Sequence, residues 1–175
     1  MSRGLPSHLI LDPLAPIPPS LGKRDRFRLG ELREAYQASM AERFQGVSLT
    51  TPEDVAALVA PIIAPLRVES LLVISLNTRN KPMGPPAIVS RGDYDGTDVP
   101  IRVVLRTVLV MEGTQFVIAH NHPTGDPAPS GADTAVTTRL VAAGRVISCP
   151  LRDHIIIGSN GRFVSLLRNR PELWS

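Results

Sequence analysis

The sequence predicts an α/β domain in which helices flank a mixed β-sheet, and three observations lead to this prediction. Of the 175 residues, 43% are hydrophobic, which is enough apolar material to bury a core. From Arg67 to the end of the chain, short segments rich in Val, Ile and Leu alternate with longer amphipathic segments. That alternation, with no internal repeat, is typical of a sheet with helices packed against it.

The N-terminal part is expected to be an extension of this domain. Residues 1–28 are rich in proline and then basic, which predicts a flexible, extended arm. Residues 29–66 predict a helical extension. Apolar residues recur at helical spacing over 29–44, and residues 51–54 (Thr-Pro-Glu-Asp) have the pattern of a helix N-terminus with a capping box. The second helix is expected to end at Pro61.

Residues 67–175 carry the remaining elements. Strands are expected at 68–76, 86–90, 114–120, 146–149, 154–157 and 162–166, and helices at 99–111 and 131–143. Gly144 is expected to end the second helix, and Gly158-Ser-Asn-Gly161 predicts a hairpin between the last two strands. The loop 91–98, with two glycines and three aspartates, is a candidate specificity element.

Composition excludes some classes of protein. The net charge is +3, and the basic residues are scattered except for the segment Lys23–Arg28, which is better explained as a solvated segment than as a nucleic-acid contact. Cys149 is the only cysteine, so neither an intramolecular disulfide nor a cysteine-based zinc site can form. Residues 1–20 have no continuous apolar core, and the longest apolar run, 55–66, is too short to span a bilayer. A cytoplasmic protein without a membrane partner is expected.

The run from His120 to Asp133 contains the candidate metal ligands. His120 and His122 are two residues apart at the end of an apolar strand, so both side chains lie on one face. Asp133 falls in the first turn of the next helix. Two imidazoles and a carboxylate are a set that holds catalytic zinc and leaves one position for water. Spacing alone leaves a second interpretation open, in which Ser130 and Asp133 merely form a capping box and the histidines enter a loop.

Metal-dependent hydrolysis also needs a general base, and Glu69 is the best candidate. It is the only acidic residue in the apolar segment 68–76, where a carboxylate is costly unless it has a partner. The alternative is a glutamate in water at the start of a strand. Both interpretations stay open on spacing alone.

A family resemblance rests on these residues. The string His-x-His-Pro-x-Gly-x-x-x-Pro-Ser-x-x-Asp at 120–133, with an upstream glutamate, resembles the JAMM (MPN+/JAB) metalloprotease signature. The string Asp-His-Ile-Ile-Ile-Gly at 153–158, together with the wording of 120–127, resembles the bacterial RadC-like branch of that family. The similarity extends from Arg67 to Leu166.

The resemblance implies a JAB/MPN, cytidine-deaminase-like architecture for 67–175 and a bound zinc ion (Zn2+). By position, it makes His120, His122 and Asp133 the zinc ligands. Glu69 would be the general base, and Ser130 the hydroxyl that stabilises the developing oxyanion. The implied activity is that of a zinc metallopeptidase acting on a peptide or isopeptide substrate.

Three neighbouring residues have less specific expectations. His154 is either a hydrogen-bond partner of a zinc-binding histidine or half of a buried polar pair with Asp153 that holds neighbouring strands. We expect the pair. Asn121 is expected to point away from both histidines and to support the loop.

The sequence departs from the RadC-like pattern in two places. Residues 99–105 lack the glutamate of the usual Pro-Arg-Glu element, and residues 1–66 lack the Gly-hydrophobic-Gly hairpin of a helix-hairpin-helix module. DNA contact through such a module is therefore unsupported. The alternative function is a non-enzymatic RadC-like accessory protein of DNA repair or mobile elements, which predicts salt-sensitive DNA binding through Lys23–Arg28. Zinc nucleoside deamination is excluded, because its Pro-Cys-x-x-Cys element needs two cysteines.

Overall fold

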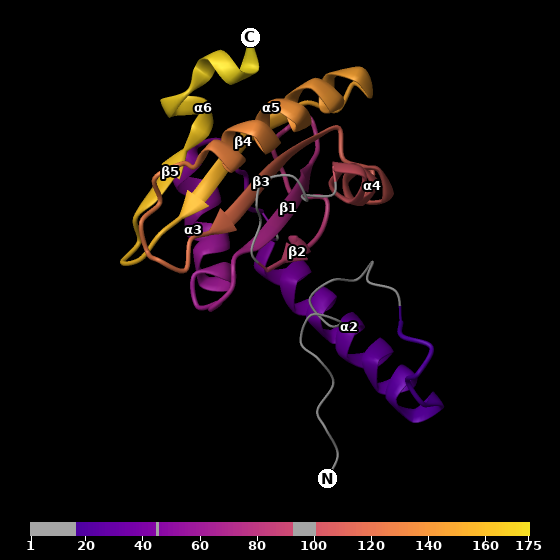
Figure 1. Ribbon diagram of the computed structural model, residues 1–175. Coiled ribbons are helices and arrows are strands. Elements are labelled where there is room, and N and C mark those ends of the chain that lie inside the picture. Colours follow the sequence, from indigo (N-terminus) through magenta and orange to yellow (C-terminus); the bar gives the residue numbers. More distant parts are fainter. Residues whose placement is uncertain (1–16, 45, 93–100) are drawn as a thin grey trace.

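The computed structural model describes residues 17–44, 46–92 and 101–175, and Figure 1 shows the arrangement of their helices and strands. The elements are α2 (Lys23–Phe44), α3 (Pro52–Ile63), β1 (Ser70–Leu76), β2 (Ala87–Arg91), α4 (Ile101–Val110), β3 (Gln115–Asn121), α5 (Gly131–Val146), β4 (Leu151–Ile157), β5 (Phe163–Ser165), α6 (Leu166–Asn169) and the 3-10 turn η1 (Pro171–Trp174). The strands form one sheet in the order β2-β1-β3-β4-β5. Strands β3 and β4 are parallel and the other neighbours antiparallel, so the predicted mixed sheet is confirmed.

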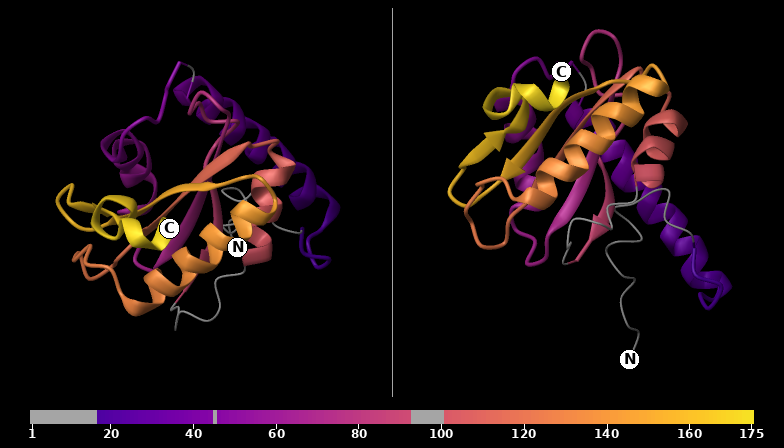
Figure 2. Two further views of the ribbon diagram at one scale, coloured as in Figure 1. Left: turned by 90° about the horizontal axis from the view of Figure 1, so that it is seen from above. Right: turned by 45° about the horizontal axis from the view of Figure 1, so that its top comes forward.

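Helices cover both faces of the sheet, as the two views in Figure 2 show. Helix α3 packs on one face, and helices α4 and α5 pack on the other. Each face has its own apolar cluster because side chains alternate along a strand. In β3, Val117 and Ala119 face α3, whereas Phe116 and Ile118 face α4 and α5. The alternation places His120 on the α5 side of the sheet.

Helix α5 is longer than predicted, and the strand expected at Val146–Cys149 is wrong. Val146 ends the helix, Ser148 turns the chain with a φ of 55°, and β4 starts at Leu151. The amide of Cys149 donates to the Gly144 carbonyl (2.8 Å) and that of Ser148 to the Arg145 carbonyl (3.1 Å). These are the two bonds of a Schellman motif, made here with serine at the left-handed position that glycine usually takes.

Gly144 therefore lies inside α5 rather than at its end. A Cβ atom on Gly144 would lie 2.6 Å from the Cys149 carbonyl oxygen, so glycine lets the returning chain pack closely against the helix. Pro61 likewise lies inside α3, which continues to Ile63. Ile63 is completely buried in the cluster under α3, and its burial offsets the hydrogen bond that proline cannot make.

The remaining differences concern element boundaries. Helix α2 begins at Lys23 rather than Leu29, so the basic segment expected in an extended arm is helical. Strand β5 ends at Ser165, because Leu166 starts α6. Of the loop 91–98, Arg91 belongs to β2 and residues 93–98 lie outside the described residues. Among the described helices, none is long and apolar enough to cross a membrane.

Candidate metal centre

Four side chains named from the sequence come together at one end of the sheet. One ligand atom from each of Glu69, His120, His122 and Asp133 lies within 4.8 Å of the others. His120 is the penultimate residue of β3, and His122 follows that strand directly. Asp133 lies in the first turn of α5, and Glu69 lies one residue before β1. Glu69 lies near the histidines because β1 and β3 are adjacent antiparallel strands.

The capping box of α5 positions Asp133. The Ser130 side chain accepts a hydrogen bond from the Asp133 amide (3.1 Å), and Asp133 Oδ2 accepts one from the Ser130 amide (2.7 Å). The capping-box interpretation and the metal-site interpretation are therefore compatible. The box leaves Oδ1 directed toward His120, with Oδ1 lying 3.1 Å from His120 Nε2.

The separations of these atoms fit a small tetrahedral cation. The two histidine Nε2 atoms lie 2.9 Å apart, and Asp133 Oδ2 lies 3.5 Å from His122 Nε2. Ligands of a tetrahedral zinc ion lie about 3.3 Å apart, given Zn–N distances of about 2.0–2.1 Å. Glu69 Oε1 stands further off, 3.9 Å from His120 Nε2. The donor set of two imidazoles and a carboxylate fits zinc, with Glu69 beside it.

The protonation state of His122 follows from its other ring nitrogen. His122 Nδ1 lies 2.7 Å from the backbone carbonyl oxygen of Asp126. Because a carbonyl can only accept, Nδ1 carries a proton, and in the neutral ring Nε2 presents its lone pair to the cluster.

Burial and neighbouring side chains shift the pKa values of Asp133 and His122. Burial alone would raise the pKa of Asp133, but the neighbouring His120 and His122 imidazoles and the Ser130 hydroxyl reverse this effect and hold its pKa well below the usual range. The hydrogen bond with Asp133 raises the pKa of His122, against the opposing effect of burial. Asp133 is therefore an anion in this site, which favours a cation next to it.

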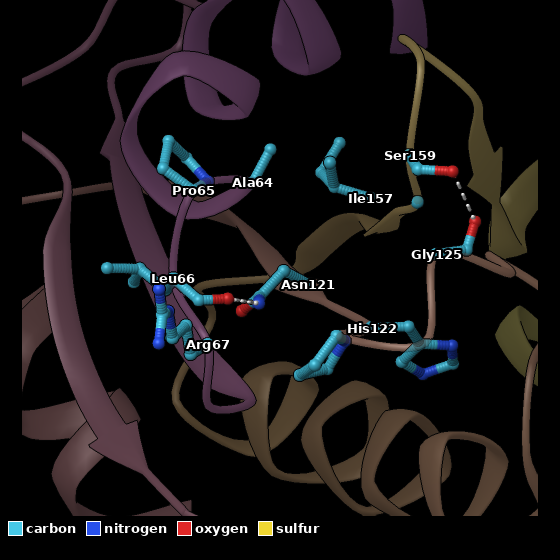
Figure 3. A pocket seen from close by; sticks show the side chains of 11 residues that line it. Ala64, Pro65, Leu66, Arg67, Asn121, His122, Gly125, Ile157 and Ser159 are labelled. Atoms are coloured by element: carbon cyan, nitrogen blue, oxygen red, sulfur yellow. Dashed lines mark hydrogen bonds between the residues drawn. The ribbon is translucent and has the colours of Figure 1, made fainter.

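The loop that follows His122 is held by the β4–β5 hairpin, which was predicted at Gly158–Gly161. The Gly125 carbonyl accepts hydrogen bonds from the Ser159 amide (3.0 Å) and from the Arg162 guanidinium (2.8 Å). The Ser159 hydroxyl also donates to it, as Figure 3 shows. This clamp fixes the loop that carries the Asp126 carbonyl.

Asn121 points away from the two histidines, as expected, but it supports a different segment. Its Nδ2 donates to the Leu66 carbonyl (3.1 Å, drawn in Figure 3) and to the Val68 carbonyl (3.3 Å). Its Oδ1 accepts from the Ser70 amide (2.9 Å). Asn121 thus holds the backbone on both sides of Glu69.

Asp153 and His154 are both buried, but their side chains do not form the expected pair, and what the carboxylate of Asp153 accepts from His154 is a hydrogen bond from the backbone amide (2.7 Å). The Asp153 carboxylate accepts from the Ser165 hydroxyl (2.6 Å) and from the Leu167 amide (3.0 Å), which ties β4 to β5 and α6. Desolvation raises the pKa of Asp153. His154 lies on the opposite face of β4, and its Nε2 is 2.7 Å from Nδ1 of His120. Burial keeps the pKa of His154 well below its usual range.

A cavity of about 420 Å³ adjoins the cluster on the side of His122. Figure 3 shows the residues around it, which come from the end of α3, the segment before β1, the loop after His122 and the start of the β4–β5 hairpin. Apolar groups such as Leu66 and Ile157 line it together with the Arg67 guanidinium. The cavity offers space for a ligand beside the four clustered side chains.

Sequence reasoning missed several groups that organise the site. Thr137 contacts a ring nitrogen of His154, and the Asp126 carbonyl contacts one of His122. Arg162 holds the loop after His122 by donating to the Gly125 carbonyl. A threonine one turn beyond Asp133, on the same helix face, was a usable signal for Thr137. A backbone carbonyl leaves no signal in a sequence.

Comparison with known families and proteins gives an independent result. The family model described as RadC-like JAB domain matches residues 49–171. The UPF0758 protein of Clostridium perfringens is 38% identical over 133 residues, which are 76% of this chain and 58% of the relative. The corresponding protein of Symbiobacterium thermophilum is 39% identical over 133 residues, covering 76% and 56%.

A UPF0758 protein of the archaeon Methanosarcina acetivorans is 36% identical over 118 residues, or 67% of this chain and 51% of the relative. The chain thus spans about half the length of the curated relatives it matches. The matched region includes all four clustered side chains.

Proposed function

Because the chain belongs to the family of RadC-like JAB domains, we propose that it is a zinc-dependent hydrolase of peptide or isopeptide bonds. His120, His122 and Asp133 would hold the ion, Glu69 would act as general base and Ser130 would stabilise the oxyanion.

One observation carries this proposal: groups that accept hydrogen bonds or bind cations converge on a single point. The Nε2 atoms of both histidines and two carboxylates lie within 4.8 Å of one another. In the neutral form of His122 the Nε2 lone pair faces this point, because the Nδ1 proton is bonded to the Asp126 carbonyl. Such an arrangement is costly without a proton or a cation at its centre, and Asp133 adds a negative charge.

The chemistry divides among these residues. Zinc, when bound, lowers the pKa of water to about 7 and polarises a carbonyl group. The Glu69 side chain is 26% exposed, so it can meet a water molecule beside the cluster and accept its proton. The same carboxyl group can return that proton to the leaving amine.

Ser130 caps helix α5 and is also proposed to stabilise the oxyanion. Its Oγ lies 2.7 Å from Asp133 Oδ2, to which it donates its proton. To donate to a substrate oxygen, that proton has to leave Asp133, while the bond from the Asp133 amide to Oγ can remain. A hydroxyl can accept and donate at once, so helix capping and oxyanion stabilisation are compatible.

The proposal is tested by metal analysis and hydrolysis of a peptide and isopeptide library. We expect about one zinc ion per chain, because the part of the chain that the structure describes offers a single set of three proposed ligands. Glu69→Gln should keep the zinc and abolish hydrolysis, whereas His122→Gln should lose both. Glu53→Gln, an exposed acidic residue of α3 paired with Arg168, is the matched control and should change neither. A zinc-loaded protein that cleaves no member of the library would contradict the hydrolase.

A second candidate is the non-enzymatic accessory role in DNA repair or mobile elements. The observation that favours it is the start of α2, where Lys23, Arg24 and Arg28 are exposed on a helix that extends away from the sheet in Figure 1. DNA binding that falls steeply with salt, and that is lost when these three residues are changed to Ser, would support it. Unchanged binding in that variant would exclude this segment as the contact.

A further inference from the structure

His154 lies behind the candidate metal centre and contacts it through His120. It projects from β4, the strand parallel to β3, and only 1% of it is exposed. Each of its ring nitrogens has one polar partner. Nε2 lies 2.7 Å from Nδ1 of His120, and Nδ1 lies 2.7 Å from the hydroxyl oxygen of Thr137 in α5.

Thr137 sets the direction of donation in this chain of hydrogen bonds. The Thr137 hydroxyl lies 2.6 Å from the Asp133 backbone carbonyl, which has no proton to give. The single hydroxyl proton of Thr137 must therefore be donated to that carbonyl. Toward His154 the same oxygen can then only accept, so His154 Nδ1 carries a proton.

The rest of the chain follows. The His154 ring is buried between a hydroxyl and an imidazole, and none of the described residues forms an ion pair with it that would compensate a positive charge. A neutral ring with its proton on Nδ1 has a lone pair on Nε2, so His120 must donate from Nδ1. In the neutral form of His120, its Nε2 then carries the lone pair, 3.1 Å from Asp133 Oδ1 and 2.9 Å from His122 Nε2.

We propose that His154 is a positioning residue: anchored by Thr137, it selects the tautomer of His120 whose Nε2 can bind a metal ion, and it fixes the orientation of that ring. The inference rests on the metal-binding function proposed above. Metal-binding histidines generally donate their other nitrogen to a carboxylate, a carbonyl or water. Here the acceptor is a second histidine, His154. Thr137 accepts from His154 and donates to the backbone carbonyl of Asp133, whose side chain is another candidate ligand.

The test compares zinc affinities of the full-length chain, measured by competition with a chromophoric chelator. Thr137→Val keeps the shape of the side chain but removes the hydroxyl, and should weaken zinc binding about 10-fold. Thr137→Ser restores the hydroxyl and should return affinity to near the parent value. His154→Phe should weaken binding by about 10- to 100-fold, the range found when such partners are removed.

The chain offers a matched control. Thr138, the next residue of α5, is exposed and makes the same type of bond to the carbonyl four residues earlier, 3.0 Å from Thr134. Thr138→Val removes an equivalent hydroxyl with no contact to His154, so zinc affinity should not change. Urea unfolding of each metal-free variant separates a loss of fold from a loss of affinity. If His154→Phe does not fold, the threonine series decides.

A spectroscopic readout distinguishes this inference from the proposed function. Long-range ¹H–¹⁵N correlation spectra of the metal-free chain should show His120 protonated on Nδ1, and His154→Phe should shift this population toward Nε2. If His154→Phe and Thr137→Val bind zinc like the parent and the His120 tautomer is unchanged, the inference is overturned and the metal function stands. If the parent binds no zinc, the proposed function fails instead, and the tautomer measurement still decides what His154 does to His120.

Discussion

The hydroxyl oxygen of Ser130 lies 2.7 Å from Asp133 Oδ2 and 3.1 Å from the amide nitrogen of the same residue, so one serine caps α5 and orients a carboxylate of the candidate metal centre. Thr51 and Asp54 form the same capping box at the start of α3, on the opposite face of the sheet. The two boxes make it possible to separate helix capping from chemistry.

Replacing each capping residue with alanine should therefore have equal effects on stability and unequal effects on hydrolysis. Ser130→Ala and Thr51→Ala should each lower the free energy of unfolding by about 1 kcal/mol. Ser130→Ala should also lower kcat by about 10²- to 10³-fold, as expected for loss of an oxyanion donor. Urea unfolding and steady-state kinetics measure the two effects. Equal kcat values for the two variants would remove Ser130 from the reaction.

Asn121 should influence hydrolysis without holding the metal. Asn121→Ala removes three hydrogen bonds from the backbone on both sides of Glu69, so the base should lose its position and kcat should fall while zinc content stays at the parent level. Asn77→Ala is the control, because Asn77 bonds the Arg79 and Lys81 amides at the other end of β1. Both changes should cost about 1–3 kcal/mol of stability. Loss of zinc from the Asn121 variant would contradict this division of roles.

The clamp between the β4–β5 hairpin and the loop after His122 depends on Gly158. A Cβ there would lie 2.6 Å from the Gly125 carbonyl oxygen and 2.7 Å from Pro127 Cδ, and backbone cannot move aside easily. Gly158→Ala should therefore destabilise the fold by about 1–3 kcal/mol and weaken zinc binding. Gly30→Ala in α2, where a Cβ meets nothing within 4 Å, should be neutral or slightly stabilising. Calorimetry and zinc competition measurements test both variants.

The contributions of His122 and Asp133 to the stability of the metal-free chain should be greatest at mildly acidic pH. The pKa of His122 is raised above its ordinary 6.5, so its contribution is complete below 6.5 and is lost as pH rises through the raised value. The pKa of Asp133 is lowered below its ordinary 3.8, so its contribution is complete above 3.8 and is lost as pH falls. Urea unfolding in chelator should show this window, and His122→Gln should flatten its upper limit.

Zinc should reverse the upper limit of that window. The ion competes with the proton on His122, so zinc-dependent stabilisation should grow as pH rises through the raised pKa of this histidine. A parent protein whose stability in zinc and in chelator follows the same pH profile would contradict a metal site at His122.

Local patterns in the sequence were sufficient for much of the site. Both capping boxes and the shared face of His120 and His122 depend on spacings of two to four residues, and the described structure contains each of them. Glu69 was identified as the single acidic residue of an apolar segment, and it lies in the cluster. The α/β class followed from alternating segments in the same way.

What could not be predicted depends on contacts between distant segments. The Schellman motif after α5 has serine where glycine is usual. The helix was therefore predicted to end at Gly144, and residues 146–149 were wrongly predicted to form a strand. The contact between His154 and His120 follows from the parallel register of β3 and β4, in which Ile118 pairs with His154. That register is set by packing across the whole sheet, and spacing along the chain does not contain it.

The parallel pairing of β3 and β4 through α5 also has a consequence for how the site is inherited and engineered. His120, His122, Asp133, Thr137 and His154 all belong to this one β-α-β unit, whereas Glu69 comes from the segment before β1. The residues proposed to hold the ion and the residue proposed to transfer the proton thus belong to separate parts of the fold. If the proposed roles hold, a substitution at the residue before β1 should leave cation binding in the β-α-β unit intact, so binding and turnover can change independently.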